Sequence, residues 1–272
     1  MSELIEEQSG IHVVVGADRV CRITIDRVDT ANALSPLARD ALTDAFNAAG
    51  DDPSVRAVLL RATGDRHFCS GAGLAPPSGQ APTEKRPGDI ARMLQKGWQR
   101  LVSAVLDCDK PVVAAVRGTA AGAGASLVLA CDLVVMSTEA KLVEAFVHRG
   151  ILPDSGAIHL LTRIVGLRKA TELLMLGEPV DAATCERLGI VNRVVALSET
   201  DAVAEELAGR LAAGPTVMLA LTKRLLSVSS ESGRDRAFEQ EAWAQEVVSG
   251  TADLQEGLNA FAQRRPPNFQ GR

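Results

Sequence analysis

The stretch VVAAVRGTAAGAGASLVLA, residues 112–130, carries the pattern that decides the fold. Its first six residues form a largely apolar, valine-rich run that is typical of a buried strand. A run of small residues follows, and residues 124–130 then have the composition of a short apolar helix. A second glycine-rich turn, SGAGL at residues 70–74, also comes after a strand-like run. The chain therefore predicts two turns at which small residues leave the backbone open to close approach.

Two such turns can bring two backbone N–H groups to one ligand atom. Donors aimed at one point can hold a carbonyl oxygen while it gains negative charge, an arrangement called an oxyanion hole. The implied ligand is an activated carbonyl compound. Each glycine could instead serve only a positive φ or tight packing, which is the usual role of a lone glycine turn.

Strand-like and helix-like segments alternate over the first two thirds of the chain. Strands are expected at residues 20–25, 55–61, 112–117 and 133–137, and helices at residues 37–49 and 90–107. Ser35 followed by Pro36 predicts the start of the first of these helices. This alternation favours an α/β protein with a parallel sheet and right-handed crossovers.

The pattern changes near residue 156 to helices interrupted by one β-branched run, residues 190–195. We expect a core at residues 1–196 and a helical C-terminal region at residues 197–272. Residues 75–88 are rich in proline, which predicts an irregular loop after the first glycine turn. That loop is placed to cover a ligand.

Composition excludes several classes of protein. The chain has 272 residues, 46% of them hydrophobic, and a formal net charge of −5, which disfavours general binding to nucleic acid or to an anionic membrane. Five cysteines without C-x-x-C pairing indicate reduced thiols, and neither a signal segment nor a membrane-spanning run is visible. We therefore expect a cytoplasmic protein. The four histidines lack the spacing of metal ligands, so no metal site is expected. No phosphate-binding or dinucleotide fingerprint is present.

Five segments in order resemble the enoyl-CoA hydratase/isomerase (crotonase) family. They are residues 31–34 (ANAL), residues 67–74 (HFCSGAGL), residues 110–132, residues 150–156 and residues 256–269. The resemblance implies a crotonase-like spiral of ββα repeats, with a helical C-terminal region that assembles trimers or pairs of trimers. It also implies a coenzyme A thioester as substrate, with no permanently bound cofactor.

The resemblance also implies roles for individual residues. It places the backbone N–H groups of Ala72 and Ala123 on the thioester oxygen. Further contacts with substrate or coenzyme A are implied for Ala31, Ala33, Ser70, Gly71, Gly73, Leu74, Gly122, Ser126, Phe146, Lys223 and Phe261. Lys223 and the adjacent Arg224 could meet the phosphates, or could be ordinary solvent-facing charges.

The acid/base residues depart from the hydratase pattern of this family. The two glutamate positions of family hydratases correspond to Ser126 and Phe146, and neither side chain can act as a carboxylate. Asp154 matches an aspartate of isomerase-type members, and the motif around it is similar to isomerases of phenylacetate degradation. Asp154 could equally be a helix N-cap. Glu144 is expected to be a solvated or ion-paired charge.

These features favour an enoyl-CoA double-bond isomerase in which Asp154 moves the proton. Two alternatives remain open: an enoyl-CoA hydratase with unusual acid/base groups, and a protein that binds acyl-CoA without turnover.

Overall fold

The computed structural model describes residues 8–73 and 86–272. Two sheets form its centre, in the orders β1-β2-β3-β5-β7-β10 and β4-β6-β8-β9. Neighbouring strands are parallel except in the pairs β1–β2 and β8–β9. The larger sheet contains β1 (Ile11–Val15), β2 (Val20–Ile25), β3 (Ala57–Ala62), β5 (Val112–Val116), β7 (Leu133–Ser137) and β10 (Arg193–Val195); the smaller contains β4 (His67–Cys69), β6 (Thr119–Ala121), β8 (Lys141–Val143) and β9 (Val180–Asp181).

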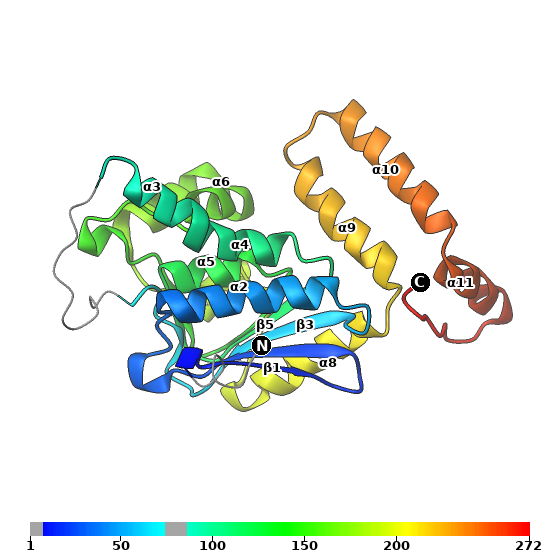
Figure 1. The fold of residues 1–272 in the computed structure, drawn as a ribbon, viewed down its shortest axis with the longest axis horizontal. Coiled ribbons are helices and arrows are strands. Elements are labelled where there is room, and N and C mark those ends of the chain that lie inside the picture. Colours follow the sequence, from blue (N-terminus) through cyan, green and yellow to red (C-terminus); the bar gives the residue numbers. More distant parts are fainter. Residues whose placement is uncertain (1–7, 74–85) are drawn as a thin grey trace.

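Helices cover both faces of the larger sheet and extend beyond it (Figure 1). They are α2 (Pro36–Asp51), α3 (Asp89–Met93), α4 (Gln99–Leu106), α5 (Ala123–Ala130), α6 (Ala157–Leu176), α7 (Ala182–Arg187), α8 (Thr200–Ala212), α9 (Thr216–Ser229), α10 (Arg234–Ser249) and α11 (Ala252–Gln263). Short 3₁₀ turns occur at Val28–Thr30, Val147–Arg149 and Leu197–Glu199. This mixed α/β architecture with a helical C-terminal region agrees with the predicted fold class.

Local sequence explains where the early elements begin. The side chain of Ser35 accepts a hydrogen bond from the backbone N–H of Ala38, 3.2 Å away, and Pro36 is the first residue of α2. The expected N-cap is therefore confirmed. The helix expected over residues 90–107 is divided, because a π-helical turn, Leu94–Trp98, joins α3 to α4.

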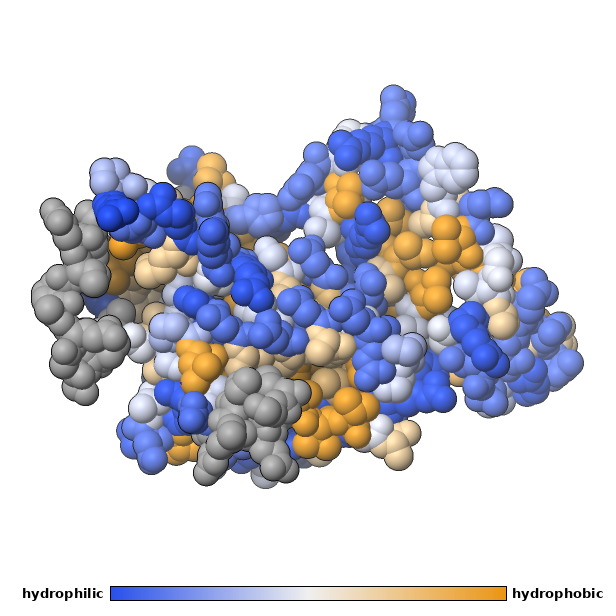
Figure 2. Space-filling view, in the orientation of Figure 1, coloured by the Kyte–Doolittle hydropathy of each residue, from blue (hydrophilic) through white to orange (hydrophobic). Residues whose placement is uncertain are grey.

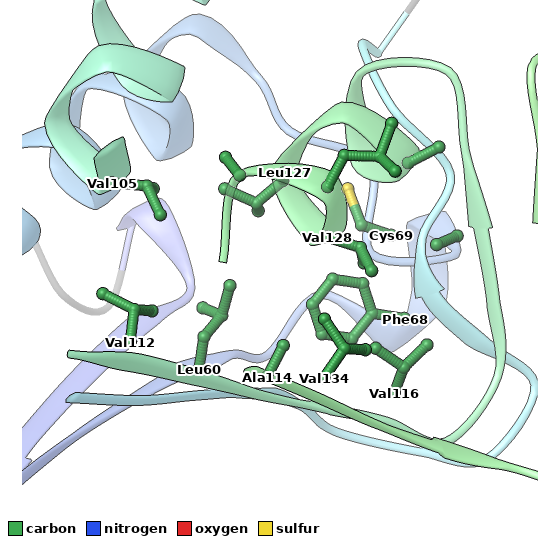
Figure 3. Packing of buried hydrophobic residues seen from close by; sticks show 14 of the residues in the cluster. Leu60, Phe68, Cys69, Val105, Val112, Ala114, Val116, Leu127, Val128 and Val134 are labelled. Atoms are coloured by element: carbon green, nitrogen blue, oxygen red, sulfur yellow. The ribbon is translucent and has the colours of Figure 1, made fainter. Parts of the chain in front are cut away.

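Alternation along the strands divides the core between the two faces of the sheet. Leu60, Ala114 and Val134 point to the same side, where they pack near Leu127 and Val128 of α5 (Figure 3). Their neighbours along the strands face the other side, in a cluster with residues of α8: Val20, Ala57, Leu59, Val113, Ala115, Val135, Ala204, Leu207, Ala208 and Ala212.

The helical region expected from residue 197 thus contains one helix, α8, that packs on the sheet. The helices α9 to α11 project from it (Figure 1). Buried Arg56 joins the two parts, donating hydrogen bonds to the Thr216 hydroxyl and to the carbonyl oxygens of Gly214 and Phe269. Within the described ranges, no single helix is long and apolar enough to cross a membrane; Leu197–Ala212 and Thr216–Ser229 satisfy that test only together, with a 108° bend between them.

Candidate active site

The carboxyl ends of three neighbouring parallel strands meet at one edge of the smaller sheet. Register pairs His67 of β4 with Thr119 of β6, and Ala121 of β6 with Val143 of β8. The segments that follow these strands, residues 70–73, 122–123 and 144–146, therefore lie together. Loops at this edge of parallel strands commonly bind ligands.

The first glycine turn is held by a two-sided bridge to Leu34. The N–H of Leu34 donates to the Gly71 oxygen at 2.9 Å, and the N–H of Gly73 donates to the Leu34 oxygen at 3.1 Å. These bonds use the groups on either side of Ala72, so the Ala72 N–H takes part in neither. Ala31, at the base of this turn, accepts a hydrogen bond from the N–H of Ser70.

The second glycine turn begins α5 directly against the first. The N–H of Gly122 donates to the Val143 oxygen at 2.9 Å, and Ala123 is the first residue of the helix. The N–H of a first helical residue has no acceptor within its own helix. A Cβ on Gly124 would stand 2.2 Å from the Cys69 oxygen, so only glycine permits this approach of α5 to β4.

A mainly apolar cavity of about 630 Å³ opens between these turns. Among the described residues, Arg149 and Asp154 are the charged members of its lining. The lining consists of Ala33, Ser70, Gly71, Ala72, Gly73, Ile90, Met93, Leu94, Trp98, Gly122, Ala123, Ala145, Phe146, Arg149, Ile151, Leu152 and Asp154. Most of the site residues implied by the resemblance are therefore brought together.

Asp154 is held by a sharp turn before α6. Ser155 and Gly156 both have positive φ, +52° and +83°, and the Ser155 hydroxyl donates to Asp154 Oδ1 at 2.8 Å. The N-cap residue of α6 is Gly156, and the side chain of Asp154 makes no capping hydrogen bond. The N-cap interpretation is therefore wrong. Burial raises the pKa of the Asp154 carboxyl, and the hydrogen bond from Ser155 opposes part of that rise.

Ser126 and Phe146 offer no acid or base. Ser126 is fully buried in α5, and its hydroxyl donates to the Gly122 oxygen at 3.4 Å. Phe146 lines the cavity, and its ring comes within 3.8 Å of where a Gly122 Cβ would stand. Ser126 thus serves local helix structure, while Phe146 contributes apolar wall.

Glu144 contradicts its expected role as a solvated or ion-paired charge. Its residue is only 2% exposed, and neither carboxylate oxygen has a hydrogen-bond partner among the described residues. Burial, and then the negative charge of Asp154, raise the pKa of Glu144 to about 8. Its place immediately after β8, at the buried edge of the smaller sheet, explains the burial. The sequence signal for this burial was the position of Glu144, a single glutamate between an apolar strand and Phe146, which lines the cavity.

Four of the implied contacts among the described residues do not line the cavity. Ala31 and Ser126 support the two glycine turns, whereas Lys223 and Phe261 lie on the projecting helices. Lys223 of α9 is ion-paired with Asp132 at 2.9 Å, and its ammonium also donates to the carbonyl oxygens of Val105 and Lys110. Phe261 lies on α11 and is 87% exposed. Leu74 and most of the expected loop, residues 75–85, lie outside the described residues.

Sequence reasoning also missed Arg149, a charged residue of the cavity lining, whose guanidinium donates a hydrogen bond to the Ala145 oxygen.

Comparison with known proteins extends over nearly the whole chain. The family model "Enoyl-CoA hydratase/isomerase" matches residues 16–272. The 1,2-epoxyphenylacetyl-CoA isomerase of Escherichia coli (strain K12) is 32% identical over 257 residues, covering 93% of this chain and 95% of that protein. The crotonyl-CoA hydratase of Syntrophomonas wolfei is 32% identical over 252 residues, with coverage of 93% and 95%.

A solved structure gives the same answer for the fold. The enoyl-CoA hydratase from Bacillus anthracis superimposes with a TM-score of 0.89 at 27% identity, covering 97% of this chain and 100% of that one. The predicted resemblance is confirmed: the chain has the crotonase fold and belongs to the enoyl-CoA hydratase/isomerase family.

Proposed function

We propose that this protein is an enoyl-CoA isomerase that moves a carbon–carbon double bond through an enolate of the thioester. Members of its family act on acyl or enoyl thioesters of coenzyme A. The observation that carries the choice of reaction is the position of Asp154, an ionisable carboxyl in the cavity lining, while the two hydratase positions hold Ser126 and Phe146.

The backbone N–H groups of Ala72 and Ala123 would receive the thioester oxygen. Support comes from the bridge to Leu34, which leaves the Ala72 N–H outside its hydrogen bonds, and from the position of Ala123 at the start of α5. Donors fixed before the reaction stabilise developing negative charge without reorganising during it. The α5 helix dipole adds to this effect, because its positive end is at Ala123.

Asp154 would then carry the proton. Its carboxylate removes a proton from the γ carbon of a 2-enoyl thioester, and the electron pair of the broken C–H bond moves through the conjugated system to the thioester oxygen. Asp154 returns the proton to the α carbon, which places the double bond between the β and γ carbons. A carboxylate whose pKa is raised by an apolar cavity is better matched to this transfer than a fully solvated one.

Incubation with trans-3-enoyl-CoA and trans-2-enoyl-CoA in deuterated water tests the proposal. Mass spectrometry should find the isomerised thioester with no added water, carrying deuterium in those turnovers in which the proton on Asp154 exchanges with solvent before its return. A 3-hydroxyacyl-CoA product would instead make the protein a hydratase. Measurable binding without any product from these thioesters or a ring-derived acyl-CoA would favour a non-catalytic acyl-CoA-binding protein.

Assembly into trimers, or pairs of trimers, is part of the same proposal. Large apolar side chains remain exposed on the projecting helices, among them Phe238, Trp243, Leu258 and Phe261. Figure 2 shows apolar surface gathered between α9 and α10 on the viewed face. Exposed apolar patches of this kind often mark subunit contacts.

A further inference from the structure

Among the described residues, Glu144 is the charged group whose surroundings are hardest to reconcile with a purely structural role. It is nine-tenths or more buried, and both of its oxygens lack a hydrogen-bond partner among the described residues. A buried polar group without a partner destabilises the folded state. A leucine or methionine would fill the same space without that cost.

The position of Glu144 connects it to both halves of the candidate site. The preceding residue, Val143, accepts the hydrogen bond from Gly122 that fixes the second glycine turn. The following two residues, Ala145 and Phe146, line the cavity. Asp154 lines the same cavity as these two residues, and its negative charge favours the protonated form of Glu144.

We propose that Glu144 is a positioning residue for the reaction of this site: the charge state of its buried carboxyl group sets how strongly Asp154 binds the proton taken from the substrate. This inference rests on the proposed function of Asp154. Glu144 does not line the cavity, so it acts through Asp154 and does not touch the substrate.

The physical basis is reciprocal coupling between two carboxyl groups. Because the charge of Asp154 favours the protonated form of Glu144, the charge of Glu144 must favour the protonated form of Asp154 by the same factor. Two such groups lose their protons in two steps that belong to the pair and not to either residue. Over the pH range between the two steps, the pair holds one proton. Loss of the proton from Glu144 therefore makes Asp154 a stronger base.

The other charged or titratable side chains close to Glu144 in sequence either have other hydrogen-bond partners or face solvent. The His148 ring is hydrogen-bonded to the Gly177 oxygen, the Arg149 guanidinium contacts the Ala145 oxygen, and Lys141 is exposed at the start of β8. Among residues 8–73 and 86–272, no ion pair reaches Glu144. Asp154 is thus the charge to which its ionisation responds.

Infrared spectroscopy of the full-length protein without substrate gives the first test. The carbonyl band of a protonated carboxylic acid should be present at neutral pH, disappear in Glu144→Gln, and persist in Glu139→Gln, a control at an exposed glutamate before β8. In Asp154→Asn the band should titrate at lower pH than in the wild type. A band unaffected by Glu144→Gln, or a midpoint unmoved by Asp154→Asn, would overturn the proposal.

The second test is the pH dependence of kcat for isomerisation. The wild type and Glu139→Gln should gain roughly three- to tenfold in kcat as pH rises through the Glu144 titration. Glu144→Gln should lack this rise, and an identical rise in that variant would refute the role in the reaction. If no variant isomerises any thioester, the proposed function fails while the infrared titration still decides whether the two carboxyl groups are coupled.

Discussion

Gly71 lies directly against Ala123: a Cβ built on Gly71 would stand 3.3 Å from the Ala123 nitrogen and 2.8 Å from the Ala121 oxygen. Real Cβ atoms essentially never come within 3.0 Å of another atom, as this one would of the Ala121 oxygen, and the contact with the Ala123 nitrogen is also tighter than most. The two glycine turns are 52 residues apart in sequence, from Gly71 to Ala123, yet they meet without space for a methyl group. The spacing between the proposed oxyanion donors therefore depends on Gly71.

Gly71→Ala is expected to lower kcat/KM by at least 100-fold and to destabilise the fold by more than about 1 kcal/mol, because φ there is +93° and the new methyl group meets backbone. Gly189→Ala is the matched control. Gly189 also has positive φ, +74°, but has nothing within 4 Å of its added Cβ. Steady-state kinetics and urea unfolding of both variants make the comparison. Equal losses of activity would show that the contact with Ala123 is unimportant.

Asp154→Asn should reduce kcat by roughly 10²–10⁴-fold, with a smaller change in KM, because the amide cannot accept the substrate proton. Binding of a non-reactive acyl-CoA, measured by calorimetry, should be retained. A variant with wild-type kcat would remove Asp154 from the mechanism.

Ser155→Ala tests the electrostatics of the same carboxyl group. The Ser155 hydroxyl stabilises ionised Asp154 through its 2.8 Å hydrogen bond, so its loss raises the pKa of Asp154 further. Activity depends on the ionised form, and the acid limb of the kcat/KM profile should therefore move to higher pH. An acid limb that stays in place or moves to lower pH would contradict this assignment.

Much of the larger sheet could be predicted from sequence because its strands are long enough to show their pattern. The ranges expected for β2 and β7 agree with the observed bounds, β5 ends one residue earlier than expected, and β3 differs by two residues at its start and one at its end. The smaller sheet could not be predicted in this way. Its strands β4, β6 and β8 have three residues each, too few to show alternation, although their ends carry the site.

Side-chain environment was harder to predict than backbone position. Asp154 could be placed near the cavity from its motif, but only the turn through Ser155 and Gly156 shows that it does not cap α6. Glu144 looked like a surface charge because its burial depends on packing between segments distant in sequence. Lys223 has three partners that come from two other segments, and local sequence specifies none of them.

Lys223→Met is expected to destabilise the protein by roughly 1–3 kcal/mol, because it removes the charged hydrogen bonds of the nearly buried Lys223 ammonium and leaves the partly exposed Asp132 carboxylate without its cation. Burial raises the pKa of Asp132, whereas Lys223 lowers it, so the variant should show a further rise. Urea unfolding of the single variants and of Lys223→Met with Asp132→Asn measures the coupling. Weakened acyl-CoA binding with unchanged stability would instead support the contact with phosphates implied by the family resemblance.

Trp243→Glu should reduce the assembly state, because Trp243 is 68% exposed on α10 within one chain and a charge there opposes burial against a partner. Size-exclusion chromatography with light scattering measures the mass. Gln245→Glu, at an exposed position on the same helix, controls for the added negative charge alone. A wild-type monomer would remove the basis for this assembly.

Glu144 also predicts how stability depends on pH. Its pKa of about 8 in the folded protein exceeds the ordinary value of 4.5, so the folded state holds a proton that the unfolded state releases over that interval. Its contribution is complete below the unfolded pKa and is lost as pH rises through about 8. The free energy of unfolding should therefore fall between about pH 5 and about pH 9 in the wild type, and fall less in Glu144→Gln. Glu144→Leu should be more stable than the wild type at the alkaline end, since it removes a buried charge without a partner. Urea unfolding across this range decides the matter: parallel curves for the wild type and Glu144→Gln would mean that Glu144 does not retain its proton on folding.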